Sequence, residues 1–252
     1  MLKIRVMPTL LYKDVSLVKG TAFDSQRRVG AALQAIKVYS MRDVDELIFL
    51  DIAATPNGHS PAFSDIDDLA DSCFMPMTVG GGVRKLEDIR RMLAVGADKV
   101  SMNTAAIETP ELIRDGAHHF GAQCIVASID VKRRSDGTAE VYSHCGEQAT
   151  GRDPVKWAQE LEQLGAGEIL LTSIERDGTM TGYDVELIRS VSNAVRIPVI
   201  ASGGAGSYSH MADALRDGQA SAVAAAAMFH FTEQTPKAAK QYLAQHGFPT
   251  RR

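Results

Sequence analysis

The sequence is poor in cysteine: Cys73, Cys124 and Cys145 stand far apart in a chain of 252 residues. No Cys-x-x-Cys pair is present, so neither a disulfide framework nor a structural zinc site is expected. The histidines and carboxylates also lack the spacing of a metal site, and no motif indicates a bound cofactor. We therefore predict no metal, no cofactor and a reducing, cytoplasmic location.

The chain also has no excess of basic residues. The chain has 27 lysines and arginines against 31 aspartates and glutamates, which gives a net charge of −4. This balance lacks the basic footprint of a nucleic-acid-binding protein. Hydrophobic runs stay far below the roughly 20 residues of a membrane-spanning helix, and MLKIRVMP does not contain the apolar core of a signal peptide. We expect neither nucleic acid nor a membrane among the partners.

The sequence does contain a regular alternation of short apolar runs and amphipathic stretches. Stretches such as EDIRRMLAV and PVKWAQELEQL carry apolar residues at helical spacing. Eight strand–helix units predict a single (β/α)8 barrel over residues 1–252, with an open doubly wound sheet as the alternative. Residues 134–150 are predicted to form a short hairpin insertion after the fifth strand. The apolar runs lie at 4–10, 46–52, 76–82, 98–102, 124–130, 168–174, 197–204 and 221–228.

The two halves of the chain resemble each other at corresponding positions. Glu46 and Glu168, in DELIFLDI and GEILLTSI, are 122 residues apart. Gly81 in TVGGG and Gly204 in ASGGAG are 123 residues apart. This repetition predicts two duplicated half-barrels, at about 1–122 and 123–252. Corresponding parts of an active site would then face each other across the barrel.

Glycine-rich segments, TVGGGV and ASGGAG, close two of the apolar runs. Active sites of such barrels lie at the C-terminal ends of the strands, and free backbone amides near a helix start favour a phosphate. Two such loops predict an elongated substrate that is phosphorylated at both ends; the alternative is that the glycines only make tight turns. The candidate substrate- and phosphate-binding residues are Lys19, Gly81, Gly82, Asn103, Thr104, Thr172, Ser202, Gly203 and Gly204.

Carboxylates at strand ends are the candidates for proton transfer. Asp130 ends the run CIVASID, where partial desolvation raises the pKa of a carboxylate towards a useful range. The alternative is a structural aspartate that caps a loop or pairs with Lys132. Asp177, in ERDGT, is a second candidate acid or a turn former, because it precedes a glycine. Lys19, in LVKG, either reaches over the mouth of the barrel as a mobile basic residue or is a solvated lysine.

Four charged residues begin or immediately precede strands at the opposite end of the barrel: Arg5, Glu46, Lys99 and Glu168. Two cations and two anions at these positions predict a ring of charges at the barrel floor, since buried charges are tolerated when they are paired. The plain alternative is a plug that only stabilises the fold, which is the usual role of residues on this face.

Together these motifs resemble the cyclase subunit of imidazole glycerol phosphate synthase, the HisF family, over nearly the whole chain. The resemblance implies a bottom face that binds a HisH-like glutaminase, a charged ring that gates ammonia, and a bis-phosphorylated substrate at the mouth. The implied phosphate-binding residues are Gly82, Asn103, Thr104 and Gly204, while Ala227 stands where the family often has a serine. The segments that carry the resemblance are LVKGTAF, DELIFLDI, TVGGGV, DKVSMNTAA, IDVKR, GAGEILLTSIERDGT, IASGGAG and MFHF.

The two catalytic aspartates of the family fall on Leu11, in TLLYKD, and on Asp130. A leucine cannot transfer a proton. A subgroup of HisF-like paralogues shares the segments LLYKD, SIDVKR and EVYSH, although LVKG keeps the glycine of the ordinary family. That subgroup implies amidation of surface-polysaccharide sugars, with a further amidotransferase protein as a partner.

We therefore expect a synthase subunit that channels ammonia to an altered acceptor. One alternative is a histidine-pathway cyclase in which Asp14 or Asp177 replaces the missing acid. Another is a non-catalytic scaffold that activates a glutaminase.

Overall fold

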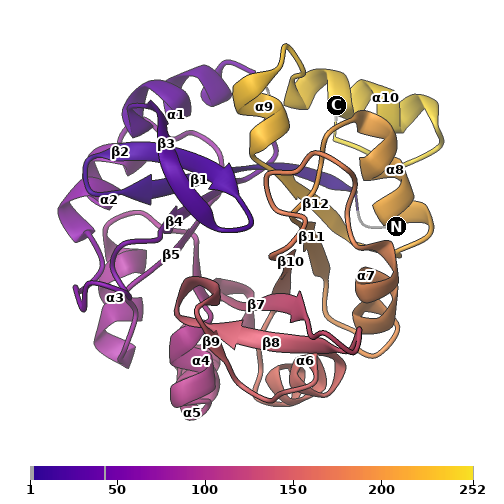
Figure 1. Ribbon diagram of the computed structural model, residues 1–252. Helices are drawn as coiled ribbons and strands as arrows, with labels where there is room; N and C mark the ends of the chain where they lie inside the picture. The colour runs from indigo at the N-terminus through magenta and orange to yellow at the C-terminus, as the bar shows by residue number, and fades with distance from the viewer. Residues whose placement is uncertain (1–2, 43, 252) are drawn as a thin grey trace.

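Eight parallel strands close into a barrel in the computed structural model, which describes residues 3–42 and 44–251 (Figure 1). The last barrel strand returns to the first through register pairs that run from Arg5–Ala222 to Pro8–Ala225. This closure confirms the (β/α)8 barrel and rules out the open sheet, in which the first and last strands would be edges. In order around the barrel the strands are β1 (Arg5–Lys13), β4 (Leu47–Asp51), β5 (Met77–Gly80), β6 (Lys99–Met102), β7 (Ile125–Arg133), β10 (Glu168–Ser173), β11 (Val199–Ser202) and β12 (Ala222–Ala225).

Helices surround the barrel and cover its outer face (Figure 1). Within residues 3–42 and 44–251, no helix combines the length and the hydrophobicity that crossing a membrane requires. The helices are α1 (Ala32–Ser40), α2 (Phe63–Ala70), α3 (Leu86–Ala94), α4 (Thr104–Glu108), α5 (Glu111–Phe120), α6 (Pro154–Gln163), α7 (Val185–Ser192), α8 (Tyr208–Arg216), α9 (Ala227–Phe231) and α10 (Pro236–Gln245), with short 3-10 turns at η1 (Ala122–Cys124) and η2 (His144–Gly146).

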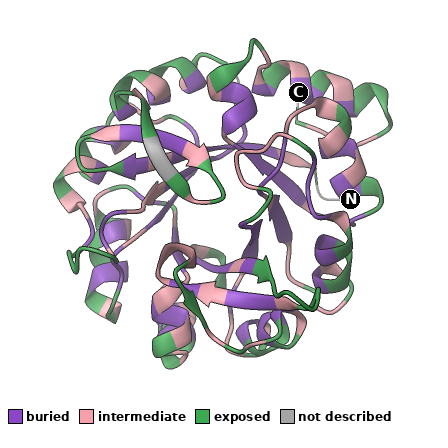
Figure 2. Cartoon of the chain, in the orientation of Figure 1, coloured by how far each residue is buried: buried purple, intermediate pink, exposed green. Residues whose placement is uncertain are grey.

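The strands are buried on both faces, which explains why they read as continuous apolar runs. Successive residues of a strand point to opposite faces. On β10, Ile169 and Leu171 therefore join the core between sheet and helices, whereas Leu170 points into the barrel. Figure 2 shows burial concentrated in the barrel strands and exposure on the outer helix surfaces and loops. The apolar layer inside the barrel consists of Met7, Ile48, Val126, Leu170, Ile200, Ala222 and Ala224.

Two strands continue past the rim of the barrel and form antiparallel hairpins. β1 pairs with β2 (Ser16–Thr21), which pairs in turn with β3 (Asp24–Gly30). β7 pairs with β8 (Ala139–Ser143), which pairs with β9 (Gln148–Ala149). The second hairpin occupies the region of the predicted insertion, whereas the sequence pattern does not indicate the first. The division into two duplicated half-barrels stays a prediction.

Candidate active site at the mouth of the barrel

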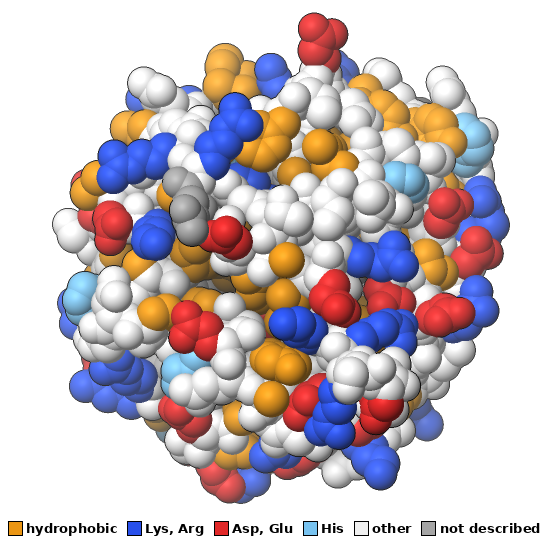
Figure 3. All heavy atoms as spheres, in the orientation of Figure 1, with side chains coloured by type: hydrophobic (Ala, Val, Ile, Leu, Met, Phe, Trp, Pro, Cys, Tyr) orange, Lys and Arg blue, Asp and Glu red, His pale blue; other side chains and the backbone are white. Residues whose placement is uncertain are grey.

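A cavity opens where the barrel strands end. Figure 3 shows this face hollowed near its centre, with hydrophobic side chains visible inside and charges of both signs around the rim. The strand ends and the loops that follow them supply the walls, as expected for a barrel of this type. The predicted site residues that line the cavity are Lys19, Gly81, Gly82, Asn103, Thr104, Asp130, Thr172, Asp177, Ser202, Gly203 and Gly204.

Asp130 lies in the cavity wall near the end of β7, within a polar shell. Its Oδ2 accepts a hydrogen bond from Nδ2 of Asn103 at 2.7 Å, and the same nitrogen donates to the carbonyl oxygen of Tyr142 at 3.1 Å. Burial raises the pKa of Asp130 to about 7; the charge of Asp177 adds to the rise, while hydrogen bonds from Asn103, Ser128 and Thr172 limit it. A carboxyl group with a pKa near 7 can both donate and accept a proton at neutral pH.

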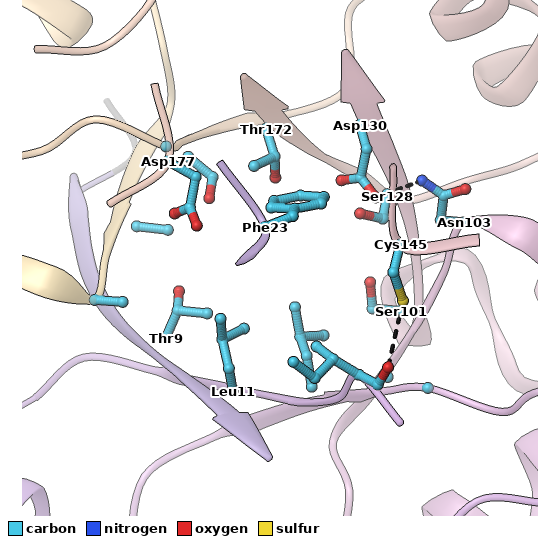
Figure 4. Close-up of a pocket in the computed structure, with 18 of the residues that line it drawn as sticks. Thr9, Leu11, Phe23, Ser101, Asn103, Ser128, Asp130, Cys145, Thr172 and Asp177 are labelled. Carbon is cyan, nitrogen blue, oxygen red and sulfur yellow. Dashed lines mark hydrogen bonds between the residues drawn. The ribbon is translucent and has the colours of Figure 1, made fainter. Parts of the chain in front are cut away.

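Leu11 lies across the cavity from Asp130, with Phe23 between them in the view of Figure 4. The two residues hold related positions: Leu11 is in register with Leu50 on the next strand of the barrel, and Asp130 with Thr172. The leucine side therefore has an apolar neighbour where the aspartate side has a hydroxyl.

Lys19 and Asp177 form an ion pair that joins the β2–β3 hairpin to the loop after β10. Nζ of Lys19 donates to Oδ2 of Asp177 at 2.5 Å, and the Lys19 side chain is 2% exposed. The backbone amide of Ala22 also donates to the carbonyl oxygen of Asp177, at 2.8 Å. Lys19 thus lines the mouth as a buried cation held in an ion pair, so the alternative of a solvated lysine is wrong. The carboxylate of Asp177 is engaged by this lysine.

Both glycine loops approach a neighbouring strand so closely that a side chain has no room. At Gly81, with φ of +111°, a Cβ atom would lie 2.2 Å from the carbonyl oxygen of Asp51. At Gly203, with φ of +85°, it would lie 2.5 Å from the carbonyl oxygen of Ser173. Gly81 therefore follows β5 and meets the end of β4, and Gly203 follows β11 and meets the end of β10. Only glycine fits at these two positions, because a side chain would collide with the neighbouring strand. The need for a tight turn therefore explains the glycines, and whether their backbone amides bind phosphate is a separate question.

The helices after the glycine loops do not begin directly at the glycines. Arg84 and Lys85 donate their backbone amides to the side chain of Asp88 at 2.9 and 3.2 Å, so the start of α3 is already capped. At α8 the residue before the helix is the cap, because Oγ of Ser207 accepts from the backbone amide of His210. Asn103 and Thr104 instead lead into the short helix α4, which opens on the cavity.

The four charges at the barrel floor form a closed ring. Arg5 lies 2.9 Å from both Glu46 and Glu168, and Lys99 lies 3.1 Å from Glu46 and 3.2 Å from Glu168. Their side chains are between 10% and 16% exposed. Each cation thus contacts both anions, and the inner apolar layer separates the ring from the cavity. This geometry supports the predicted ring and is compatible with both a plug and a gate.

Comparison with known proteins then decides the family. The model of a family described as "Histidine biosynthesis protein" matches residues 5–235. Two relatives from Caulobacter vibrioides, strains NA1000 / CB15N and ATCC 19089 / CIP 103742 / CB 15, are described as "Imidazole glycerol phosphate synthase subunit HisF". Each is 49% identical over 252 residues, which cover 100% of this chain and 97% of the relative. The chain belongs to the HisF family.

Membership of the HisF family confirms the resemblance seen in the motifs. The relatives are named for the synthase itself, so they agree better with a histidine-pathway cyclase than with sugar amidation. The paralogue subgroup suggested by Leu11 and LLYKD stays a prediction.

Several features of the cavity were not predicted from the sequence. Thr9 and Ser128 line the cavity two residues before Leu11 and Asp130, so the period of a strand would have placed them on the inner face. Phe23 and Cys145 come from the two hairpins, and no local signal brings them to the mouth. Within the described residues, no group of histidines, cysteines and carboxylates is arranged to hold a metal ion.

Proposed function

We propose that this chain is the synthase subunit of an imidazole glycerol phosphate synthase, which adds ammonia to a bis-phosphorylated substrate at the barrel mouth. The observation that carries the proposal is one cavity in which Asp130, with a pKa near 7, lies among residues of two glycine loops, above a ring of paired charges. The HisF family assignment supports the reaction class.

The two ends of the substrate would bind at the two glycine loops. Gly81 and Gly82 with Asn103 and Thr104 form the first candidate phosphate site, and Gly203 and Gly204 form the second. The second site is lined by Ala226 and Ala227, so backbone amides carry more of its binding. Inside the cavity, two buried side-chain atoms, Oγ1 of Thr9 and Oδ1 of Asn103, lack hydrogen-bond partners among the described residues. Because buried polar atoms are normally satisfied, these atoms favour a polar ligand here.

Ammonia would enter from the opposite face. A glutaminase subunit docked on the bottom face would release ammonia beneath Arg5, Glu46, Lys99 and Glu168. Ammonia, unlike the ammonium ion, is uncharged, and it is small. It can therefore cross the apolar layer of the barrel once the ion pairs separate. Lys99 is the cation best suited to swing aside, since it ends in a flexible point charge whereas Arg5 presents a planar fork.

A second candidate function differs in the acceptor, and Leu11 is the observation that favours it. The first strand end of the cavity carries a leucine, and its neighbour Leu50 is apolar as well. Such a site suits ammonia transfer to another phosphorylated or nucleotide-linked acceptor, such as the acetamido group of a surface-polysaccharide sugar, with a further amidotransferase protein. A scaffold that only activates a glutaminase is the remaining candidate, and it requires no substrate binding in the cavity.

The test is turnover of the bis-phosphorylated histidine-pathway intermediate with saturating ammonium salt, for the wild type, Leu11→Asp and Asp130→Asn. The proposal expects an active wild type and an inactive Asp130→Asn variant. An inert wild type with an active Leu11→Asp variant would instead favour the altered acceptor. If the wild type and both variants are inactive, and calorimetry detects no binding of the substrate, the result would favour the scaffold that only activates a glutaminase.

A further inference from the structure

Three carboxylates line the cavity among the described residues: Asp51, Asp130 and Asp177. Asp177 is engaged by the buried ammonium of Lys19, and Asp130 already has a role in the proposed reaction. Asp14, the other acid close to Leu11 in sequence, is exposed in the β1–β2 turn and does not line the cavity. Asp51 is thus the carboxylate in the cavity that still has no assigned role.

Asp51 ends β4, the strand that pairs with β1, and it is in register with Tyr12. It therefore lies one strand across and one residue along from Leu11. Its Oδ1 accepts the backbone amides of Ala53 at 3.0 Å and Ala54 at 3.1 Å. Among the described residues, Oδ2 of Asp51 has no hydrogen-bond donor. One oxygen thus fixes the carboxylate, and the other has lone pairs available to a ligand.

β1 and β7 are each followed around the barrel by a strand whose last residue meets a glycine loop. Leu11 is the residue of β1 that lines the cavity nearest the mouth, and Asp51 is the last residue of the next strand, β4, beside Gly81. Asp130 lies on β7, and Ser173 ends the next strand, β10, beside Gly203. The acid that is missing from one strand is therefore present on its neighbour.

Cys145 lines the same cavity as the two carboxylates. Burial, and then the charges of Asp130, Glu147 and Asp51, raise the pKa of the Cys145 thiol to about 12. Sγ of Cys145 donates to the carbonyl oxygen of Ile52, the residue after Asp51, at 3.4 Å (Figure 4). Asp51, Asp130 and Cys145 thus line one cavity, which a single ligand can occupy.

We infer that Asp51 is the second proton-transfer residue of this cavity and acts as general base opposite the general acid Asp130; the inference rests on the proposed function. Ammonia adds to a carbonyl carbon of the substrate through its lone pair. Asp51 removes one proton from the added nitrogen, and Asp130 delivers one to the oxygen that leaves as water. The C=N bond forms as the C–O bond breaks, and a second nitrogen-bound proton passes to the departing hydroxyl, so atoms and charge balance without a redox partner.

The environment of Asp51 suits the base. Burial raises its pKa, and the two backbone amides on Oδ1 oppose that rise by stabilising the anion. Asp130 has the pKa of about 7 and keeps a proton to donate near neutrality. Two carboxylates in unlike surroundings are the usual arrangement for separate acid and base roles.

The test compares Asp51→Asn in two backgrounds, wild type and Leu11→Asp, with ammonium salt as the nitrogen source. An asparagine Oδ1 still accepts the amides of Ala53 and Ala54, so the loop is retained. In the wild-type background we expect kcat to fall about 10²–10⁴-fold with KM nearly unchanged, and the acidic limb of the pH profile to disappear. In the Leu11→Asp background the added carboxylate offers another base, so the fall should be at least about tenfold smaller.

Asp65→Asn is the matched control, because Asp65 binds the hydroxyl of Tyr12 at 2.6 Å nearby and does not line the cavity. It should keep most of the activity. An active wild type whose Asp51→Asn variant is equally active would overturn the role of Asp51 alone. An equal loss in both backgrounds would show that Asp51 only shapes the loop. An inert wild type would reject the proposed function and this inference with it.

Discussion

The ends of β1 and β7 have the same backbone arrangement but carry different side chains towards the cavity. Both strands have nine residues and both continue into an antiparallel hairpin. On β7, Asp130 is surrounded by Asn103, Ser128 and Thr172. On β1, the neighbour of Leu11 that corresponds to Thr172 is Leu50. Leu11 thus has an apolar neighbour on β4, and the carboxylate of Asp51 follows one residue further along that strand.

The largest effect should come from the acid on β7. Asp130→Asn is expected to lower ammonium-dependent turnover about 10²–10⁴-fold, because the amide cannot transfer a proton. Steady-state kinetics with the bis-phosphorylated substrate measure the loss. The control is Asp136→Asn, an exposed aspartate in the hairpin that follows β7. Similar rates for all three proteins would end the assignment of Asp130.

The glycine loops test whether the two halves are equivalent in their backbone. Gly81→Ala and Gly203→Ala should each lower the free energy of unfolding by about 3 kcal/mol or more, since each methyl group would collide with a backbone carbonyl. Gly137→Ala is the matched control: its φ of +84° is similar, but no atom lies within 4 Å of the added methyl. It should cost about 1–2 kcal/mol. Denaturant unfolding measures all three, and equal losses would contradict the close approach.

Asp130 also makes stability depend on pH. Its pKa is about 7 in the folded protein and about 3.9 in an unfolded chain, so the folded state binds more protons between these values. Stability should therefore fall as pH rises from about 4 to 7, and Asp130→Asn should recover on the order of 1–3 kcal/mol at pH 8, allowing for solvent in the cavity. Unfolding of both proteins at pH 5 and pH 8 tests the sign. A variant that is less stable than the wild type at pH 8 would contradict it.

The smallest expected effect concerns the floor, where Arg5, Glu46 and Lys99 come from the first part of the chain and only Glu168 comes from the second. Lys99→Ala removes two of the ion pairs and should change glutamine-dependent turnover with the glutaminase several-fold more than turnover with free ammonium. Lys156→Ala, an exposed lysine on α6, serves as the control. If both nitrogen sources respond equally to Lys99→Ala, the ring is a plug that stabilises the barrel.

Much of the architecture could be predicted because it is local. All eight apolar runs became barrel strands, and Asp130, the glycines and the four ring residues fell where strand ends place them. The β2–β3 hairpin was missed because its residues, DSQRRVG among them, lack the alternation of a half-buried strand. Phe23 and Cys145 reached the cavity through these hairpins, so their role depended on a fold that short-range patterns do not encode.

The sequence by itself determined the barrel and the position of each polar residue along its strand, because strand period and turn chemistry act over a few residues. It also showed directly that position 11 carries no acid. Only the tertiary structure decided that Lys19 meets Asp177, that the four floor charges close into a ring, and that Asp51 and Asp130 line one cavity. Each of these depends on distances between residues far apart in the chain. The raised pKa of Asp130 is likewise a product of the desolvation that the closed barrel creates around it.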